Sequence, residues 1–510
     1  MKKIAFLLVL ILSLAGLGTA AVAEEPVVIR FMTTEFVNAA LTSDTFTIQT
    51  LEDRLGIQLD LSTPASAPED YAEKFNIMLS SGDYPDIMYA TPELVNQYLD
   101  TGIFLDLTEI MPERMPNVYQ QVQAYGALKD ITDDSGKIWF VPKLEGSVAM
   151  WEIDWINQSW LDELDLEVPK TTDELYEVLK AFKAAKGDDC IPMTMGPWAD
   201  KLHNFYYAFN TWSDWQMFSE ETGMEYGPYD HAEEMRACLT YLNKLYSEGL
   251  LDNDWMQADK KSTQTDFVSG NCILGYAPFG QGLGNYTKAM MEADPNFKED
   301  YIQAAAPVTS TKGKNAKFSK MNNIYDQSGA SAAISSQCKN VKAAVWLLDW
   351  LYSEEGQICY NFGIEGESYE MKDGKPVYTD LIMNNPDGMS VAQALAAYTR
   401  ASTSGAGIQS EDYIDQYYAQ DNQKKALELS MKTDMGEHMF PPTSVSEENQ
   451  DRYSEIMSQV KTLADEMEAS FICGTTPMSE WDSYQQKLKD AGIEEAVQMM
   501  QEAYDTYMAN

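Results

Sequence analysis

The stretch PVVIRFMT (26–33) is short and apolar, and two similar runs follow it, IQLDLS (57–62) and PDIMYA (85–90). Each run predicts a buried strand. The segments between them, 43–55 and 71–80, have the periodicity of helices. Alternating strands and helices are typical of a parallel sheet covered by helices, so the N-terminal part is predicted to be α/β.

Further along the chain the pattern becomes helical. Thr171 in VPKTTDELYEVLKAFK (168–183) can cap a helix while Glu174 reaches back to it, and the following apolar positions predict one buried face. The C-terminal third shows helical spacing almost throughout. We interpret two of its stripes as core packing and not as a cofactor site: Ile456, Val460, Leu463 and Met467, and then Ile493, Val497, Met500, Tyr504 and Tyr507.

The first residues have the features of a secretory leader. Two lysines precede an apolar segment at 4–17, and Ala21-Val22-Ala23 offers a cleavage site before Glu24. The apolar segment is too short to span a bilayer, so residues 1–23 are predicted to be a signal peptide. Leu17 stands where a lipid-attachment box would carry cysteine. We therefore expect a periplasmic or extracellular protein associated with the cell envelope, preferably free in a periplasm.

Composition and charge exclude several classes of protein. The chain has 510 residues, more than one core usually holds, so two large domains are expected. Hydrophobic residues make up 45% and aromatic residues 11%, which is too apolar for a disordered chain. Aspartate and glutamate total 80 against 36 lysines and arginines, a net charge of −44. Such a charge repels nucleic acid and anionic membranes, so neither is an expected partner.

The usual enzyme motifs are missing from the sequence. It has three histidines and no H-E-x-x-H, which argues against zinc or triad chemistry. It has no G-x-S-x-G and no P-loop, and GQGLGN (280–285) lacks the third glycine of a dinucleotide fingerprint. The six cysteines include no C-x-x-C pair; we favour buried free thiols and leave disulfides open. We therefore expect no enzyme, with a carbohydrate hydrolase using two carboxylates as a minor alternative.

Four groups of segments, in order along the chain, carry a family resemblance. They are SSGDYPDIMYA (80–90) with GIFLDLTEIM (102–111), SGKIWFVP (135–142) with WINQSWLDELDLEVPKTTDELYEVLKAFK (155–183), FVSGNCILGYAPFG (267–280), and FGIEGESYEMKDGKPVYTD (362–380) with FICGTTPMSEWDSYQQKLKDAGIEEAVQMMQEAYDTY (471–507). Together they resemble the extracellular solute-binding proteins (family 1) of ABC importers, in particular the long LplA-like and alginate-binding branch.

The resemblance implies a type II periplasmic-binding-protein fold, α/β, with two lobes joined by hinge segments. We assign 24–142 plus 303–335 to an N-terminal lobe, and 143–302 plus 336–510 to a C-terminal lobe with a helical extension. It also implies a monomeric receptor that captures an oligosaccharide between its lobes and delivers it to a membrane permease. A peptide or other small metabolite as ligand, and a surface interaction protein that has lost transport, are the alternatives.

Candidate ligand-binding residues come from two arguments. Ligands of open α/β sheets lie at the carboxyl ends of strands, which selects Glu35, Thr91 and Glu93. The resemblance, extended to maltose-binding proteins, implies that the loop after GNCILGYA faces the ligand, which nominates Tyr276 and Phe279.

Aromatic residues supply further candidates, because sugar C–H faces stack on rings. Trp151, Trp198, Trp212 and Trp215 occupy polar-looking positions, as does Trp155, although packing under a loop would explain them equally. Trp346 and Trp350 have helical spacing that predicts core packing.

Two features bear on cofactors and ligand charge. Relatives often have a calcium loop after the helix at 174–182, but here KAAKGDDCIPMT (183–194) is short and has only Asp188 and Asp189 as acids. Calcium takes six to eight oxygen ligands, so we predict no calcium site and no cofactor. Acidic sugars are bound through arginine forks. Most of the six arginines lie in surface-like helical settings, so a neutral oligosaccharide is expected.

Overall fold

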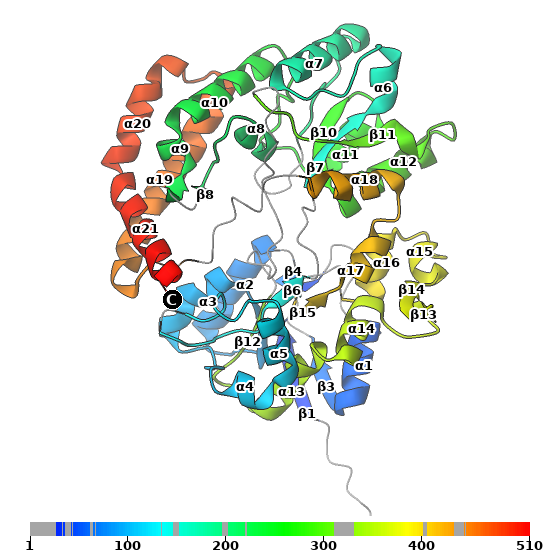
Figure 1. Ribbon diagram of the computed structural model, residues 1–510, viewed down its shortest axis with the longest axis vertical. Helices are drawn as coiled ribbons and strands as arrows, with labels where there is room; N and C mark the ends of the chain where they lie inside the picture. The colour runs from blue at the N-terminus through cyan, green and yellow to red at the C-terminus, as the bar shows by residue number, and fades with distance from the viewer. Residues whose placement is uncertain are drawn as a thin grey trace, which may run out of the picture.

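The computed structural model describes residues 27–32, 34–35, 42, 44–61, 65–66, 68–133, 135–145, 152–195, 202–219, 222–310, 331–400, 405–432, 443 and 445–509. The protein has two lobes, one above the other in Figure 1, each with its own hydrophobic core. The mixed α/β architecture predicted from the sequence is confirmed.

A four-stranded sheet in the order β12-β5-β1-β3 lies at the centre of the N-terminal lobe. β1 pairs in parallel with β3 and β5, as the alternation of strands and helices predicts, and β12 joins antiparallel to β5. The strands of this lobe are β1 (Val27–Met32), β2 (Thr34–Glu35), β3 (Ile57–Asp60), β4 (Ala65–Ser66), β5 (Ile87–Ala90), β6 (Lys143–Glu145), β12 (Ser331–Ile334), β13 (Tyr369–Lys372), β14 (Lys375–Tyr378) and β15 (Gly407–Gln409).

Helices pack around this sheet, including several that follow β12 in the sequence (Figure 1). They are α1 (Phe46–Leu55), α2 (Pro68–Ser81), α3 (Pro92–Tyr98), α4 (Ile110–Arg114), α5 (Pro116–Ala124), α13 (Val341–Leu351), α14 (Glu354–Phe362), α15 (Asp380–Met383), α16 (Val391–Tyr398) and α17 (Glu411–Tyr417), with the 3-10 turn η1 (Leu99–Thr101).

The C-terminal lobe is built on an antiparallel sheet in which β7 (Glu152–Asn157) lies between β10 (Leu274–Pro278) and β11 (Ile302–Ala305). A hairpin of β8 (Trp215–Ser219) and β9 (Gly223–Tyr226) lies beyond it. The remaining elements before the extension are α6 (Gln158–Glu163), α7 (Thr172–Lys186), α8 (His203–Ala208), α9 (Gly227–Asp230), α10 (Ala232–Ser247), α11 (Lys260–Val268), the π-helical turn η2 (Phe279–Gly284), α12 (Asn285–Ala293), η3 (Glu299–Tyr301) and α18 (Asp421–Ser430).

Helix α7 begins as the sequence predicts. The Thr171 side chain accepts a hydrogen bond from the Glu174 amide at 3.2 Å, and the Glu174 carboxylate accepts one from the Thr171 amide at the same distance. Such a cap stabilises a helix start by about 1 kcal/mol. The stripe Leu175, Val178, Leu179 and Phe182 is buried in the core of the C-terminal lobe.

A helical extension completes the C-terminal lobe. The long α19 (Glu447–Cys473) packs along α10, and α20 (Trp481–Asp490) and α21 (Ile493–Ala509) run back over it, with the short turn η5 (Met478–Glu480) between (Figure 1). The predicted stripes form the inner faces of α19 and α21, except that Tyr507, at the end of α21, reaches the other lobe.

The two cores divide the chain at different points from those predicted. Buried side chains between 338 and 413 pack in the N-terminal core, although 336–510 was assigned to the C-terminal lobe. β11 hydrogen-bonds to β7, so 302–305 belongs to the C-terminal lobe, although 303–335 was assigned to the other. β6 returns to β15 in the N-terminal lobe, although 143 was taken as the start of the second. The helices after β12 resemble those of the extension in pattern, so periodicity alone did not separate them.

Other expectations can be checked against burial. All six cysteines are free thiols, and five of them are buried. Trp350 is buried as predicted, but Trp346 is 49% exposed on α13, because it lies on the outer side of that helix. Trp155, which seemed polar in setting, is fully buried. Along the described part of the chain, every helix is too short or too polar to cross a bilayer.

Candidate ligand-binding site

The sheet of the C-terminal lobe has two different faces. On one face Trp155 packs against Tyr286 of α12, and the facing Gly275 leaves room for its indole, because a side chain there would collide with the ring. Directly opposed residues of an antiparallel pair point to the same side. Asp154 and Tyr276 are such a pair, so they share the other face, and both are buried.

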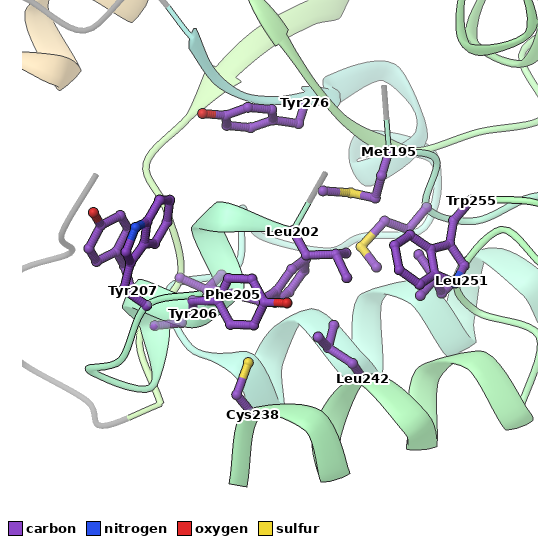
Figure 2. Close-up of a cluster of buried hydrophobic side chains, with 14 of the residues drawn as sticks. Met195, Leu202, Phe205, Tyr206, Tyr207, Cys238, Leu242, Leu251, Trp255 and Tyr276 are labelled. Carbon is purple, nitrogen blue, oxygen red and sulfur yellow. The ribbon is translucent and has the colours of Figure 1, made fainter. Parts of the chain in front are cut away.

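Tyr276 belongs to the same hydrophobic core as Tyr207 and Trp212, and we call these three side chains the aromatic wall. Tyr207 of α8 stacks on Trp212, with ring centres 4.6 Å apart and an interplanar angle of 17°. Figure 2 shows Tyr276 and Tyr207 in one cluster with Met195 and the other side chains of α8. The Ser310 amide donates to the Ala208 carbonyl at 2.9 Å, so the segment after β11 runs beside this wall. A ring and a carboxylate on one surface suit a ligand with both apolar faces and hydroxyl groups.

The N-terminal lobe contributes a buried ion pair on β6. Lys143 Nζ lies 3.0 Å from Glu145 Oε1, and both side chains are more than nine-tenths buried. Side chains alternate along a strand, and Leu144 between them packs in the N-terminal core, so the pair faces away from that core. The charge of Glu145 also contributes to the raised pKa of Tyr418, which packs in the C-terminal core. The ion pair therefore lies at the junction of the lobes.

The chain crosses between the lobes from α17 to α18, and the π-helical turn η2 packs against this crossing. Tyr418 meets Phe279 edge-on, with ring centres 5.4 Å apart, and Gln423 Nε2 donates to the Phe279 carbonyl at 2.7 Å. Phe279 opens the π-helical turn η2, whose Gly280 lies against the Tyr417 hydroxyl so closely that a Cβ would collide with it. The glycine-rich GQGLGN motif thus allows close packing at the crossing from α17 to α18, which we call the hinge.

Four of the predicted ligand-binding residues lie in the described part of the C-terminal lobe. Tyr276 and Trp212 belong to the aromatic wall, whereas Phe279 is fully buried at the hinge. Trp215, 8% exposed, packs on Tyr226 of the β8–β9 hairpin.

The other predicted residues belong to the N-terminal lobe or lie outside the described part. The Thr91 hydroxyl caps α3 by accepting from the Leu94 amide at 3.0 Å. Glu35 in β2 and Glu93 in α3 are described in their backbone alone, and Trp151 and Trp198 lie outside the described residues.

Sequence reasoning missed Lys143, Glu145, Asp154 and Tyr207. Glu145 lies at the carboxyl end of a strand, and the same rule selected Thr91. That strand, β6 within PKLEG, has only three residues, too few to be predicted from the sequence. Four of the six arginines, Arg54, Arg114, Arg236 and Arg452, lie in helices and are not buried, as expected of most of them, but one arginine differs. Arg400 is only 6% exposed, because it follows α16 into the N-terminal core, where its amide donates to the Tyr360 carbonyl.

Two surface hollows lie elsewhere on the C-terminal lobe. One, of about 410 Å³, is between β9 and α21, and the other, of about 280 Å³, is between α6, α11 and α12. Neither is lined by a predicted ligand-binding residue. We therefore place the candidate site at the lobe junction, on chemical grounds. Within the described ranges no three His, Cys, Asp or Glu side chains gather as metal ligands would, and the calcium question stays a prediction.

Comparisons with known proteins agree with this architecture. The family model described as bacterial extracellular solute-binding protein matches residues 57–358. Lipoprotein LipO of Bacillus subtilis (strain 168) is 25% identical over 461 residues, which is 86% of this chain and 84% of that protein. The fructooligosaccharide ABC transporter substrate-binding protein FusA of Streptococcus pneumoniae serotype 4 is also 25% identical, over 91% of this chain and 87% of its own.

Solved structures share the fold. The alginate-binding protein AlgQ2 without calcium ion superposes with a TM-score of 0.78 at 21% identity, covering 94% of this chain and 98% of that one. FusA of S. pneumoniae in complex with kestose gives a TM-score of 0.75 at 20% identity, covering 95% and 100%. Since the family model spans more than half of the sequence, and both lobes have counterparts in these structures, the chain belongs to the bacterial extracellular solute-binding protein family.

Proposed function

We propose that this protein is an exported receptor of an ABC importer, which captures a neutral oligosaccharide between its lobes and delivers it to the permease. The observation that carries the proposal is the shared face of Tyr276 and Asp154, in the same core as the stacked Tyr207 and Trp212. A sugar ring offers a C–H face to such rings and hydroxyl groups to the carboxylate.

The charges at the lobe junction favour a neutral ligand. Lys143 is a buried cation there, and its ammonium lies 3.0 Å from the Glu145 carboxylate. An acidic sugar would have to compete with Glu145 for Lys143, and would also approach a chain of net charge −44. Relatives bind both kinds of sugar by name: FusA is a fructooligosaccharide protein, whereas YtcQ of B. subtilis is a polygalacturonan/rhamnogalacturonan-binding protein.

The remaining parts of the proposal concern how the receptor works. We infer that residues 1–23 are removed on export, that the mature chain acts as a monomer, and that it releases its ligand unchanged. A family of receptors supports a binding role. A peptide or another small metabolite is the alternative ligand.

A thermal-shift screen of the mature chain, residues 24–510, tests this function. A ligand that binds only the folded state raises the unfolding midpoint by mass action. Neutral oligosaccharides, uronate oligosaccharides and peptides should be compared, with chromatography of the ligand after incubation. A shift with neutral sugars and intact ligand is expected. A shift from peptides alone would favour the alternative, and cleavage of the sugar would contradict the receptor role.

The ion pair offers a sharper version of the test. Glu145→Gln removes one negative charge 3.0 Å from Lys143, so the variant should bind uronate oligosaccharides more tightly relative to neutral ones. Unchanged preference in calorimetric titrations would show that the pair is not in contact with the ligand.

A further inference from the structure

The end of the helical extension makes a contact with the other lobe. Tyr507, in the last turn of α21, donates a hydrogen bond from its hydroxyl to Asp130 Oδ1 at 2.5 Å. Lys129 Nζ lies over the same ring, 4.0 Å from its centre. The three side chains form a small assembly of hydroxyl donor, carboxylate and cation, which we call the rim contact.

The partners of the rim contact belong to different cores. α21 packs in the C-terminal core through Ile493, Met500 and Tyr504. The loop that carries Lys129 and Asp130 is held in the N-terminal core by the flanking Ala127 and Ile131. The hydrogen bond therefore joins the two lobes directly.

The rim contact lies across the molecule from the hinge. In Figure 1 the C-terminus is at the left edge of the junction between the lobes, whereas α17 and α18, between which the chain makes one of its crossings, are at the right. Rotation about a hinge displaces the points farthest from it most. A hydrogen bond needs donor and acceptor within about 3.2 Å, so this one forms only over a narrow range of lobe angles.

The chemistry of the contact suits a reversible bond. Burial and the neighbouring Asp130 raise the pKa of Tyr507, so its hydroxyl keeps its proton and remains a donor near neutral pH. A hydrogen bond to a charged acceptor is stronger than one between neutral groups. The contact consists of three side chains and is only partly buried, so it can break without unfolding either core.

We propose that Tyr507 is a positioning residue for ligand capture: its bond to Asp130 holds the lobes together at the rim opposite the hinge and slows ligand release. This proposal rests on the proposed function only in that capture is measured with a sugar. The hydrogen bond holds the lobes together in the ligand-free protein as well.

The test compares Tyr507→Phe, Asp130→Asn and the double variant with the parent chain. Tyr507→Phe removes only the hydroxyl and keeps the ring under Lys129. We expect each single variant to raise the dissociation rate of the captured sugar about threefold to tenfold, with the association rate changed less than twofold. Tyr507→Phe removes the donor of the bond, and Asp130→Asn removes the charge of its acceptor. The double variant should therefore be no worse than Tyr507→Phe alone.

A matched control is available within one lobe. Tyr229 donates to Glu494 Oε1 at 2.7 Å, and Lys489 lies over its ring at 5.6 Å, the same chemistry without a partner in the other lobe. Tyr229→Phe should leave both rates unchanged. Unaltered dissociation in Tyr507→Phe, tighter binding, or additive effects of the two rim variants would overturn the proposal.

Small-angle scattering separates this proposal from the proposed function. Without any ligand, Tyr507→Phe should show a larger radius of gyration than the parent or Tyr229→Phe. If no sugar binds the parent chain, the proposed function fails, and the scattering result alone decides the role of Tyr507. An unchanged radius of gyration would then overturn it.

Discussion

Tyr276 and Phe279 lie three positions apart, yet their surroundings give them different roles. Tyr276 shares a sheet face with Asp154 and belongs to the aromatic wall. Phe279 has no exposed surface, and its ring and carbonyl are held by Tyr418 and Gln423 of the hinge. Strand alternation and the turn after Pro278 separate the two residues, so the ligand role remains proposed for Tyr276, and Phe279 is assigned to the hinge.

Substitutions should separate these roles. Tyr276→Phe is expected to weaken sugar binding up to about tenfold and to lower the free energy of unfolding by no more than about 1 kcal/mol, because it removes one hydroxyl and keeps the packed ring. Phe279→Ala should lower the free energy of unfolding by about 3–5 kcal/mol, as for other buried phenylalanines. Titration calorimetry and urea unfolding measure the two quantities. Full affinity in Tyr276→Phe would show that the hydroxyl does not touch the ligand.

Asp266 on α11 lowers the stability of the folded protein by an amount that depends on pH. Burial, and then the negative charge of Asp252, raise the pKa of its carboxyl to about 6. Between about pH 4 and pH 6 the folded protein therefore holds a proton that the unfolded chain has released. Stability falls as the pH rises through this window, and the full cost is present above it.

Removing the charge should therefore stabilise the protein at neutral pH. Asp266→Asn is expected to add about 1 kcal/mol to the free energy of unfolding at pH 7, a discounted value because the side chain is partly exposed. The gain should vanish below about pH 4, where the aspartic acid is neutral in both states. Urea unfolding at several pH values measures this, with the exposed Asp300→Asn as control. A gain that is independent of pH would contradict the assignment.

At the scale of elements, the π-helical turn η2 connects the sheet of the C-terminal lobe to the hinge. Gly280 faces the Tyr417 ring, which is held by stacking on Tyr413 at 5.3 Å. Gly284 faces the Gln423 amide, which is hydrogen-bonded to the Phe279 carbonyl but stands on an unbranched side chain with more rotatable bonds than the Tyr417 ring. The two glycines therefore differ in how easily their neighbours can yield to a methyl group.

Alanine at these two positions should have unequal effects. Gly280→Ala is expected to cost about 1–3 kcal/mol of stability through overpacking and to change sugar affinity, because the displaced Tyr417 belongs to the hinge. Gly284→Ala should cost less than about 1 kcal/mol. Thermal unfolding and titration of both variants provide the comparison. Equal effects would show that the hinge does not depend on the close approach of Gly280.

Local signals predicted elements well and lobe membership poorly. The capping box at Thr171 needs only residues three positions apart, and the sequence was sufficient to find it. The pairing of β11 with β7, by contrast, joins residues far apart in the chain, and nothing in IQAA indicates its partner. For the same reason the Lys143–Glu145 pair could not be predicted. Its position depends on the pairing of β6 with β15, which lies far away in the sequence.

At the scale of the whole molecule, the net charge of −44 acts on both lobes at once. Like charges on a compact chain repel, and dissolved salt screens them. From about 0.01 M to 0.15 M salt the screening length falls from about 30 Å to 8 Å, below the dimensions of a lobe. Exposed ion pairs such as Arg452–Glu495 lose a little under the same change, but each contributes little.

Stability should therefore rise with ionic strength. We expect the unfolding midpoint at pH 7 to increase by several degrees over that range of sodium chloride. Near pH 4.2, the isoelectric point of the sequence, the net charge vanishes and the effect should too. Differential scanning calorimetry at both pH values measures this. A midpoint that falls with salt at pH 7 would mean that attractive pairs outweigh the repulsion.

The chain returns to the N-terminal lobe at β12, and this determines the order in which the two lobes can fold. β12 pairs with β5, and Asp349 of α13 accepts the amide of Asn117 at the start of α5 from 232 positions away. Synthesis proceeds from the N-terminus, so the entire sheet of the second lobe emerges before the first lobe can finish. Until then β5 presents an open strand edge, which is the kind of surface that invites aggregation. The first lobe to begin is thus unable to fold alone, and the interleaved path makes the two lobes mature together.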